Sequence, residues 1–327
     1  MLVRARGWCR VDLAGGTLDI WPLGVLHRGA RTVNVAIDIP VQVEVESSSS
    51  GFSVVQGGKT VRAASAAELA AHPATDLVGE ILRQLDAPPV AVRIESGSPR
   101  GGGLGASSAL AVALMAAVEK LTARPRSTPQ QASALARDLE ARLMGLPTGR
   151  QDHYPALLGG ALEIRHRPGG EVVRQLDIDL EVLGDALIVA YTGRSHFSAG
   201  SNWQVVRRRL DGEAESVALF DGICAAARAL LAALESDDLP EVGRQMGVEW
   251  SYRRRLAKGV STPEIEDLLT AADAAGAWGG KATGAGGGGC VAILAPPARR
   301  PAVVEALAAG GALLLAARPA RGGLAIN

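Results

Sequence analysis

The sequence predicts an α+β fold, because strand-like and helix-like segments alternate irregularly along it. Alternating apolar residues indicate half-buried strands over 41–45 (VQVEV) and 90–94 (VAVRI), so the first third looks rich in strands. No steady strand–helix repeat and no repeat of fixed period runs along the chain, which disfavours a doubly wound fold. With 327 residues, 47% of them hydrophobic and 21% charged, the chain can form two ordinary domains and is too apolar to be disordered.

Helix signals are clearest in the second hundred residues. Apolar, helix-forming residues predict a buried helix over 107–121. Thr128 followed by Pro129 is typical of an N-cap and a first helical turn, and this second helix is expected to end near Met144, before Gly145.

The remaining elements are predicted from apolar runs and their boundaries. The Ser- and Gly-rich stretch 47–60 is expected to be a flexible loop, with room for a short hairpin. The later elements are expected as buried strands over 186–193 and 290–295 and as helices over 220–235, 262–275 and 301–309. The weakest internal boundary lies at 183–185, so we expect domains of 1–183 and 184–327.

Charge and cysteine content exclude several classes of partner. Basic and acidic residues number 34 each, so no net field attracts nucleic acid or an anionic membrane. The basic triplets 207–209 and 253–255 are therefore interpreted as solvated helix faces. The longest apolar run, 109–118, is half a membrane span. The three cysteines are far apart, as in neither a disulfide framework nor a paired zinc site, and no histidine, His153 and His196 included, has metal-ligand spacing. We expect a cytoplasmic protein.

A glycine-rich segment, SPRGGGLGASSAL at 98–110, follows a predicted strand and opens a predicted helix. Glycines let backbone N–H groups approach an anion, and the helix N-terminus adds partial positive charge, so the segment predicts a phosphate cradle. Ser107 and Ser108 would place hydroxyls beside the phosphates, where one can ligate Mg²⁺. No Lys follows the glycines as in the usual P-loop, and a flexible turn capped by serines is the alternative.

Two further glycine-rich segments lie near the chain ends. Residues 279–290 (GGKATGAGGGGC) run into a predicted strand and imply a backbone that comes very near a ligand or another loop. Residues 10–20 place Thr17 and Asp19 on a Gly-Gly turn, where a carboxylate can bind sugar hydroxyls or cap the turn.

Together these three segments resemble, in order and position, the motifs of the GHMP kinases (galactokinase, homoserine, mevalonate and phosphomevalonate kinases). The resemblance spans nearly the whole chain, and PRGGGLGASSAL is its most specific part. It implies a two-domain α+β fold, with a ribosomal protein S5 domain 2-like N-terminal domain and a ferredoxin-like C-terminal domain. It also implies ATP in the cleft between them, Mg²⁺, and a small-molecule acceptor. A homodimer stays open.

The segment GRQDHYPALLGGAL at 149–162 is similar to segments of galactokinases and bacterial heptose-phosphate kinases, as is YTGRS at 191–195. This sugar-1-kinase branch, which includes D-glycero-D-manno-heptose 7-phosphate kinase, implies phosphorylation of the anomeric hydroxyl of a sugar or sugar phosphate. The implied catalytic residues are Asp152 and Arg10, and the implied Mg²⁺ ligands are Ser107 and Glu140. The implied nucleotide-binding residues are Pro99, Gly101, Gly102, Gly103, Leu104, Gly105, Ala106, Ser107 and Ser108. The implied substrate-binding residues are Gly16, Thr17, Asp19, Gly149, Gly284 and Gly286.

Several alternatives stay open. Leu18 separates Thr17 from Asp19, where the family commonly has Thr-Asp, and Gly16 stands where galactokinases have His. The acceptor could therefore be an unphosphorylated sugar, as in galactokinase-like or fucokinase-like enzymes, or a non-sugar alcohol of the mevalonate type. The chain could also be a silent sugar-binding protein.

Ordinary structural roles are the alternatives for single residues. Asp152 could cap a turn, and Glu140 could pair with Arg137 or Arg142 on an exposed helix face. If the acceptor carries a 7-phosphate, cations must meet it, and Arg28, Arg31 and Arg194 are the candidates.

Overall fold

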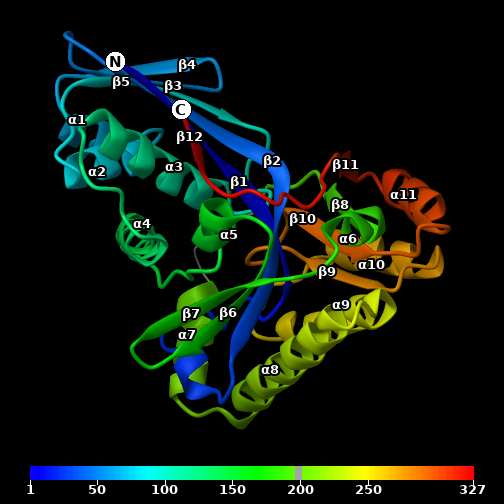
Figure 1. The fold of residues 1–327 in the computed structure, drawn as a ribbon. Helices are drawn as coiled ribbons and strands as arrows, with labels where there is room; N and C mark the ends of the chain where they lie inside the picture. Colours follow the sequence, from blue (N-terminus) through cyan, green and yellow to red (C-terminus); the bar gives the residue numbers. More distant parts are fainter. Residues whose placement is uncertain (196–200) are drawn as a thin grey trace.

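The computed structural model in Figure 1 describes residues 1–195 and 201–327, and His196 lies outside them. The described residues form an eight-stranded and a four-stranded sheet, with helices packed on both. The predicted α+β class is confirmed.

The strands of the larger sheet are β1 (Leu2–Ala14), β2 (Arg31–Ser47), β3 (Phe52–Gln56), β4 (Lys59–Ala63), β5 (Val90–Ser96), β6 (Ala161–Arg167), β7 (Gly170–Leu176) and β12 (Ala325–Ile326). Those of the smaller sheet are β8 (Leu187–Tyr191), β9 (Gly279–Ala282), β10 (Cys290–Leu294) and β11 (Leu313–Leu315).

The helices are η1 (Leu23–Leu26), α1 (Ala66–Ala71), α2 (Asp76–Gln84), α3 (Ala106–Leu121), α4 (Pro129–Met144), α5 (His153–Leu158), α6 (Leu180–Ala186), α7 (Ser201–Leu210), α8 (Ala214–Glu235), α9 (Leu239–Arg253), α10 (Pro263–Ala274) and α11 (Arg300–Ala309).

The long antiparallel strands β1 and β2 are the central pair of the larger sheet, whose strand order is β12-β1-β2-β5-β3-β4. The second half of β2 pairs with β5, while its first half pairs with β6, from Arg31 opposite Arg165 to Val35 opposite Ala161. β2 therefore carries two branches of the sheet, which Figure 1 shows diverging along its length.

The two predicted strands lie inside β2 and β5, and their valines at 41, 43, 45, 90 and 92 are buried as alternation requires. The expectation of a flexible loop over 47–60 is wrong for most of that stretch. β3 and β4 form a hairpin there, as the sequence analysis had allowed. Gly57 and Gly58 both have positive φ and close it, because a two-residue turn of that kind matches the twist of paired strands.

Local helix signals gave the boundaries of α4. The Thr128 side chain accepts from the N–H of Gln131, whose own side chain accepts in return from the N–H of Thr128, and Gly145 ends the helix in the left-handed conformation. The helix predicted over 107–121 is α3, which is buried almost all round because it packs on β1 and β2 and beneath α2, α4 and α5.

The smaller sheet is buried on both faces. Alternate residues such as Leu187 and Val189 join a core with α8 and α9, while Ile188 and Ala190 join a core with α10 and α11. This explains why β8 and β10 appear in the sequence as continuous apolar runs. Among the described residues one helix, α8, is long and apolar enough to cross a membrane, but over half of that stretch is buried inside the protein, as in a core helix.

The chain returns to its starting sheet at its end. β12 pairs with β1, and Pro319 bridges to Ile37, so residues beyond the smaller sheet pack on the larger one (Figure 1). The expected division into 1–183 and 184–327 falls inside α6 and stays a prediction.

Candidate active site

A cleft of about 890 Å³ brings the three glycine-rich segments together. It is lined by all the residues that the sequence analysis assigned to catalysis, nucleotide, substrate or metal, except Gly16. The remaining wall comes from strands of the larger sheet, from α7 and α9, and from the loop that follows β9 of the smaller sheet.

The segment before α3 has the geometry of an anion cradle. Gly101, Gly103 and Gly105 all have φ between +64° and +72°, which only glycine adopts readily. The first bond within α3 runs from the N–H of Ala109 to the carbonyl oxygen of Gly105 (3.0 Å), and no side chain caps the helix. The N–H groups of its first turn are therefore left for a ligand.

The second glycine loop packs directly on this cradle. The Cys290 N–H donates to the Gly102 carbonyl oxygen (2.9 Å), and a Cβ on Gly284 would lie 2.7 Å from the Gly103 carbonyl oxygen. Gly286 is equally constrained, because its Cβ would lie 2.2 Å from the carbonyl oxygen of Val260. The glycines thus meet another loop, and Gly284 and Gly286 also line the cleft.

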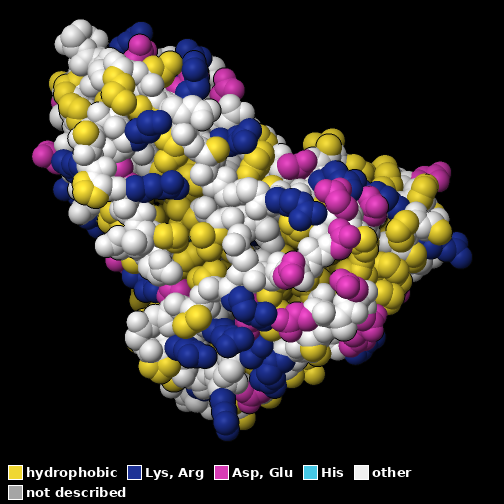
Figure 2. All heavy atoms as spheres, in the orientation of Figure 1, with side chains coloured by type: hydrophobic (Ala, Val, Ile, Leu, Met, Phe, Trp, Pro, Cys, Tyr) yellow, Lys and Arg dark blue, Asp and Glu magenta, His cyan; other side chains and the backbone are white. Residues whose placement is uncertain are grey.

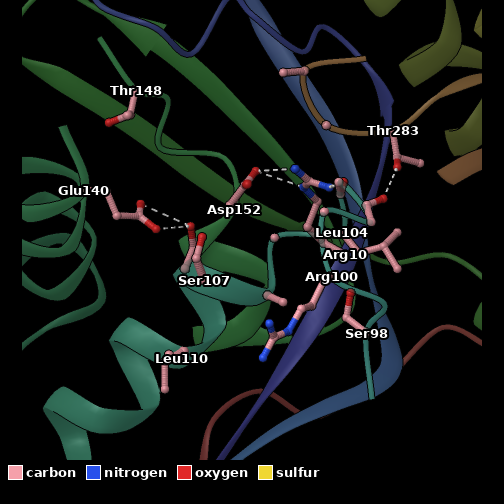
Figure 3. Close-up of a pocket in the computed structure, with 18 of the residues that line it drawn as sticks. Arg10, Ser98, Arg100, Leu104, Ser107, Leu110, Glu140, Thr148, Asp152 and Thr283 are labelled. Atoms are coloured by element: carbon pink, nitrogen blue, oxygen red, sulfur yellow. Dashed lines mark hydrogen bonds and ion pairs between the residues drawn. The ribbon is translucent and has the colours of Figure 1, made fainter. Parts of the chain in front are cut away.

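Asp152 and Arg10 form an ion pair that faces the cradle (Figure 3). The Arg10 Nη2 atom lies 2.7 Å from Oδ1 of Asp152, and Arg10 is almost fully buried while the Asp152 side chain is 28% exposed. Asp152 precedes α5 but makes no capping bond, so the turn-cap alternative does not hold. A Cβ on Gly105 would lie 3.3 Å from the Asp152 Cβ, so the pair touches the cradle.

Glu140 points into the same cleft from α4 and has two polar neighbours. The Ser108 hydroxyl donates to Oε1 (3.0 Å), and the His153 Nε2 lies 3.0 Å from Oε2. Burial raises the pKa of Glu140, but His153 and Ser108 outweigh it and the net shift is downward. Ser107 stays exposed at the helix start.

The alternative for Glu140, a surface pair with Arg137 or Arg142, does not occur. Arg137 pairs with Asp138, and Arg142 pairs with Glu80. Within the described residues Glu140 therefore has no guanidinium partner, and it is oriented toward the start of α3 (Figure 3).

Asp19 also lines the cleft, near Asp152, and has little room around it. The Gln151 N–H donates to its Oδ2 (3.1 Å), and a Cβ on Gly149 would lie 1.7 Å from that oxygen, so position 149 requires glycine. Burial and the nearby charge of Asp152 raise the pKa of Asp19 to about 6. The buried Oε1 atom of Gln151 accepts no hydrogen bond from the described residues.

A buried charge network lies behind these groups. Oδ2 of Asp12 is 2.9 Å from Nζ of Lys281 and 2.8 Å from Nη1 of Arg253, and Oδ1 accepts from the Gly284 N–H (3.0 Å). Glu249 Oε2 lies 2.8 Å from the same lysine. Burial raises the pKa of Asp12, but Lys281 and Arg253 more than reverse that shift and hold the carboxylate ionised.

This buried network overturns the expectation that Arg253 is solvated, and it explains why position 16 is a glycine. Arg253 was taken as part of a solvated triplet, but it is 2% exposed, because α9 turns it inward toward Asp12. A Cβ on Gly16 would lie 2.7 Å from Arg253 Nη1, so Gly16 supports the network rather than lining the cleft.

The three arginines expected to meet a 7-phosphate are not in the cleft. Arg28 and Arg31 line a separate hollow, and Arg194 pairs with Glu264. Arg28 and Arg31 follow the Asp19 turn in sequence, but the fold places them at the other hollow. Their position in the sequence did not reveal this.

Sequence reasoning missed five residues that shape the site, namely Asp12, Gln151, His153, Lys281 and Arg253. Gln151 and His153 flank Asp152, so their position was an available signal. The others had none, because their partners lie far away in sequence.

We expect Asp12→Asn to lower the free energy of unfolding by about 3 kcal/mol, because it leaves buried cations short of a counter-charge. Urea unfolding monitored by circular dichroism measures it. The matched control is Asp211→Asn, which removes an exposed pair with Arg207 and should change stability by less than about 0.5 kcal/mol. Equal losses in the two variants would contradict the role given to Asp12.

Comparisons with known proteins agree with this geometry. Residues 68–160 match the GHMP kinases N terminal domain, and residues 230–313 match the GHMP kinases C terminal domain. A mevalonate kinase of Methanothermobacter thermautotrophicus is 30% identical over 262 residues, which cover 78% of this chain and 80% of that protein.

Two further comparisons differ in reach. A mevalonate kinase of Thermococcus sibiricus is 32% identical over 204 residues, but these span only 60% of this chain and 57% of that relative's length. The crystal structure of a D-glycero-D-manno-heptose 1-phosphate kinase from Bacteriodes thetaiotaomicron superposes with a TM-score of 0.76 over 99% of this chain and 98% of that one, at 22% identity. With both family domains matched in order and the two-domain fold shared, the chain belongs to the GHMP kinase family.

Proposed function

We propose that this protein is an ATP-dependent kinase that phosphorylates the anomeric hydroxyl of a sugar. The observation that carries the proposal is the Arg10–Asp152 pair, which faces both the anion cradle and the end of the cleft that holds Asp19. A carboxylate held between a phosphate site and a polar pocket is placed to act where a phosphoryl group meets a hydroxyl.

The fit to ATP rests on the free N–H groups of the first turn of α3. The triphosphate would lie along residues 101–108, against the positive end of the α3 dipole. Beyond the cradle, the cleft continues between the β3–β4 turn and residues 93–96 of β5, which leaves room for the rest of the nucleotide.

The fit to Mg²⁺ rests on Glu140 and the two serines. An ionised carboxylate and a hydroxyl are the oxygen ligands that Mg²⁺ takes from a protein when a nucleotide supplies the others. Ser107 is the serine that the sequence favoured, while Ser108 is the one bonded to Glu140. When bound, the ion would neutralise negative charge on the phosphates.

In the chemical step, Asp152 would accept the proton of the attacking hydroxyl. Arg10 holds the Asp152 carboxylate in place through two nitrogens, Nε and Nη2, both within 2.9 Å of Oδ1. Because phosphoryl transfer has a loose transition state, positioning does most of the work and proton removal assists.

Hydrogen-bond acceptors at the Asp19 end favour a polyhydroxyl acceptor. The Asp19 carboxylate and the Gln151 Oε1 atom, which has no partner among the described residues, can each accept a hydrogen bond from a hydroxyl group. Asn202 and Thr148 add polar atoms to the wall. The described cations there, Arg10 and Arg253, already pair with carboxylates. We therefore favour an unphosphorylated sugar over heptose 7-phosphate.

A mevalonate-type acceptor is the second candidate. It is supported by the names of the sequence relatives and by the unpaired Nε of Arg253, which could meet a carboxylate. Against it, such a carboxylate would lie near Asp19 and Asp152, which repel it. Retention of Asp152, Glu140 and the serines argues against a silent binding protein. The cytoplasmic location and a homodimer remain predictions.

Asp152→Asn should lower kcat by about 10²–10⁴-fold, the usual contribution of a general base, with ATP affinity largely kept. Steady-state kinetics and calorimetric titration of a non-hydrolysable ATP analogue measure the two. Asp138→Asn, which changes an exposed carboxylate on α4, is the control and should turn over like the parent. Turnover of Asp152→Asn within a few-fold of the parent would remove Asp152 from the chemistry.

Glu140→Gln should raise the Mg²⁺ concentration needed for half-maximal activity by about tenfold, and Ser107→Ala should raise it more mildly. Ser108→Ala tests the other hydroxyl, and Glu46→Gln, an exposed change on β2, serves as the control. Magnesium titrations that are unchanged in Glu140→Gln and in both serine variants would rule out this metal site.

The acceptor is tested by an ATP-consumption screen of galactose, fucose, arabinose, mannose, heptose 7-phosphate and mevalonate. We expect an unphosphorylated sugar to be turned over fastest, and ³¹P–¹H coupling in the product to place the phosphate on the anomeric carbon. Preference for heptose 7-phosphate would overturn the unphosphorylated assignment alone. Preference for mevalonate would overturn the sugar assignment and leave the kinase assignment standing.

Asp19 gives that screen a second readout through pH. Since burial and Asp152 raise the pKa of Asp19 to about 6, kcat/KM for the sugar should rise as pH rises through about 6, where the carboxylate forms. Asp19→Asn should lose this pH dependence and raise KM.

The contribution of Asp19 to folding stability has the opposite sign. Because its carboxyl pKa is raised in the folded state, the folded state becomes more stable as pH falls from about 6 toward 4.

A further inference from the structure

A second hollow, of about 370 Å³, lies between the turn that follows η1 and the far end of the β6–β7 hairpin. None of the residues that line it also lines the catalytic cleft. We propose that this hollow binds a small phosphate-bearing anion, of the size of a diphosphate, at a site distinct from the phosphate cradle.

Four arginines from three parts of the fold converge here. The lining includes Arg28 of the turn, Arg31 of β2, and Arg165 and Arg167 at the end of β6. Arg31 and Arg165 are directly opposite one another in the β2–β6 ladder, a placement of like charges that costs stability when nothing lies between them.

One buried carboxylate serves three of the guanidinium groups. Glu163, with no exposed side-chain surface, lies 3.1 Å from Arg31, 2.8 Å from Arg165 and 2.9 Å from Arg174. Arg174 also pairs with Glu235 (2.6 Å), so two carboxylates face three guanidinium groups and one positive charge is left unbalanced. Burial lowers the pKa of Arg31, and the charges of Arg165 and Arg228 add to that effect although Glu163 opposes it.

Two of the guanidinium groups that line the hollow have no anionic partner among the described residues. Arg28 and Arg167 are exposed and form no ion pair within residues 1–195 and 201–327. Gly29 brings Arg228 of α8 close to Arg31, since a Cβ there would lie 3.9 Å from both Arg228 Nη1 and Arg31 Nη2. Guanidinium groups arranged in this way match the oxygens of phosphate, with which arginine forms paired hydrogen bonds.

The two histidines of the hollow do not add to this charge at neutral pH. Burial lowers the pKa of His166 to about 4, and burial also lowers that of His27, which lies between Asp221 and Arg209. The excess positive charge of the site is therefore carried by arginine and persists across the physiological pH range.

The concentration of charge is local, because the whole chain is neutral. Figure 2 shows dark-blue side chains gathered on the lower part of the molecule, where Figure 1 places β7 and α7. The hollow favours a compact anion over an extended polymer or a lipid surface, since those need a long basic stripe or a broad flat patch.

Calorimetric titration of inorganic pyrophosphate into the full chain, in magnesium-free buffer and with a saturating non-hydrolysable ATP analogue, tests the proposal. We expect binding that the analogue does not displace. The double variant Arg28→Gln/Arg167→Gln should weaken it at least tenfold. The control, Arg62→Gln/Arg126→Gln, removes two exposed arginines elsewhere and should leave it unchanged.

The outcomes separate this site from the proposed kinase function. No analogue-resistant binding, or equal binding by the two double variants, would overturn the anion site without touching the catalytic proposal. Should Arg28→Gln/Arg167→Gln fold poorly, Arg228→Gln, an exposed change on α8, must show the same loss. Tighter binding of a single-stranded oligonucleotide or of anionic vesicles than of pyrophosphate, with the same variant dependence, would overturn the small-anion assignment.

Discussion

The cleft depends on one buried carboxylate, that of Asp12. It lies on β1 of the larger sheet, and its partners Arg253 and Lys281 are 241 and 269 residues away on α9 and β9. The same carboxylate accepts the Gly284 N–H and so fixes the start of the second glycine loop against the first. Arg10 is two residues earlier on the same strand. The pairing that joins the two halves of the chain therefore also determines where the Arg10–Asp152 pair meets the cradle.

The carboxylates around the catalytic pair each have a basic side chain as a partner, with Asp19 as the exception. Asp152 has Arg10, Asp12 has Arg253 and Lys281, and Glu140 has His153 with a serine hydroxyl. Asp19 makes no ion pair within the described chain and depends on the N–H groups and side chain of Gln151, so burial raises its pKa. A buried carboxylate without a cationic partner is stabilised by neutral hydroxyl donors, and this is the physical basis of the proposed sugar acceptor.

What could be predicted from the sequence follows from how local each signal is. The limits of α4 were predictable because Thr128 and Gly145 act within a few residues, and the cradle was predictable because glycines, serines and a helix start lie together in the chain. Arg253 was not, since two neighbouring arginines of its triplet are on the surface and only a partner 241 residues away turns it inward. Arg28 and Arg31 follow the Asp19 turn in sequence, yet the chain leads them to another hollow.

The sequence relatives are mevalonate kinases, whereas our proposal from the chemistry of the pocket is a sugar acceptor. The two lines of argument depend on different residues. The alignment with the Thermococcus sibiricus mevalonate kinase covers 60% of this chain, and identity over such a length averages many positions that never meet the acceptor. The acceptor, in contrast, meets a few side chains, among them Asp19, Gln151 and Asp152. Function resides in such a site rather than in the fold that carries it. Because a few charges and hydrogen-bond acceptors can change which acceptor binds without altering the fold, our proposal of a sugar acceptor rests on the pocket chemistry rather than on overall identity.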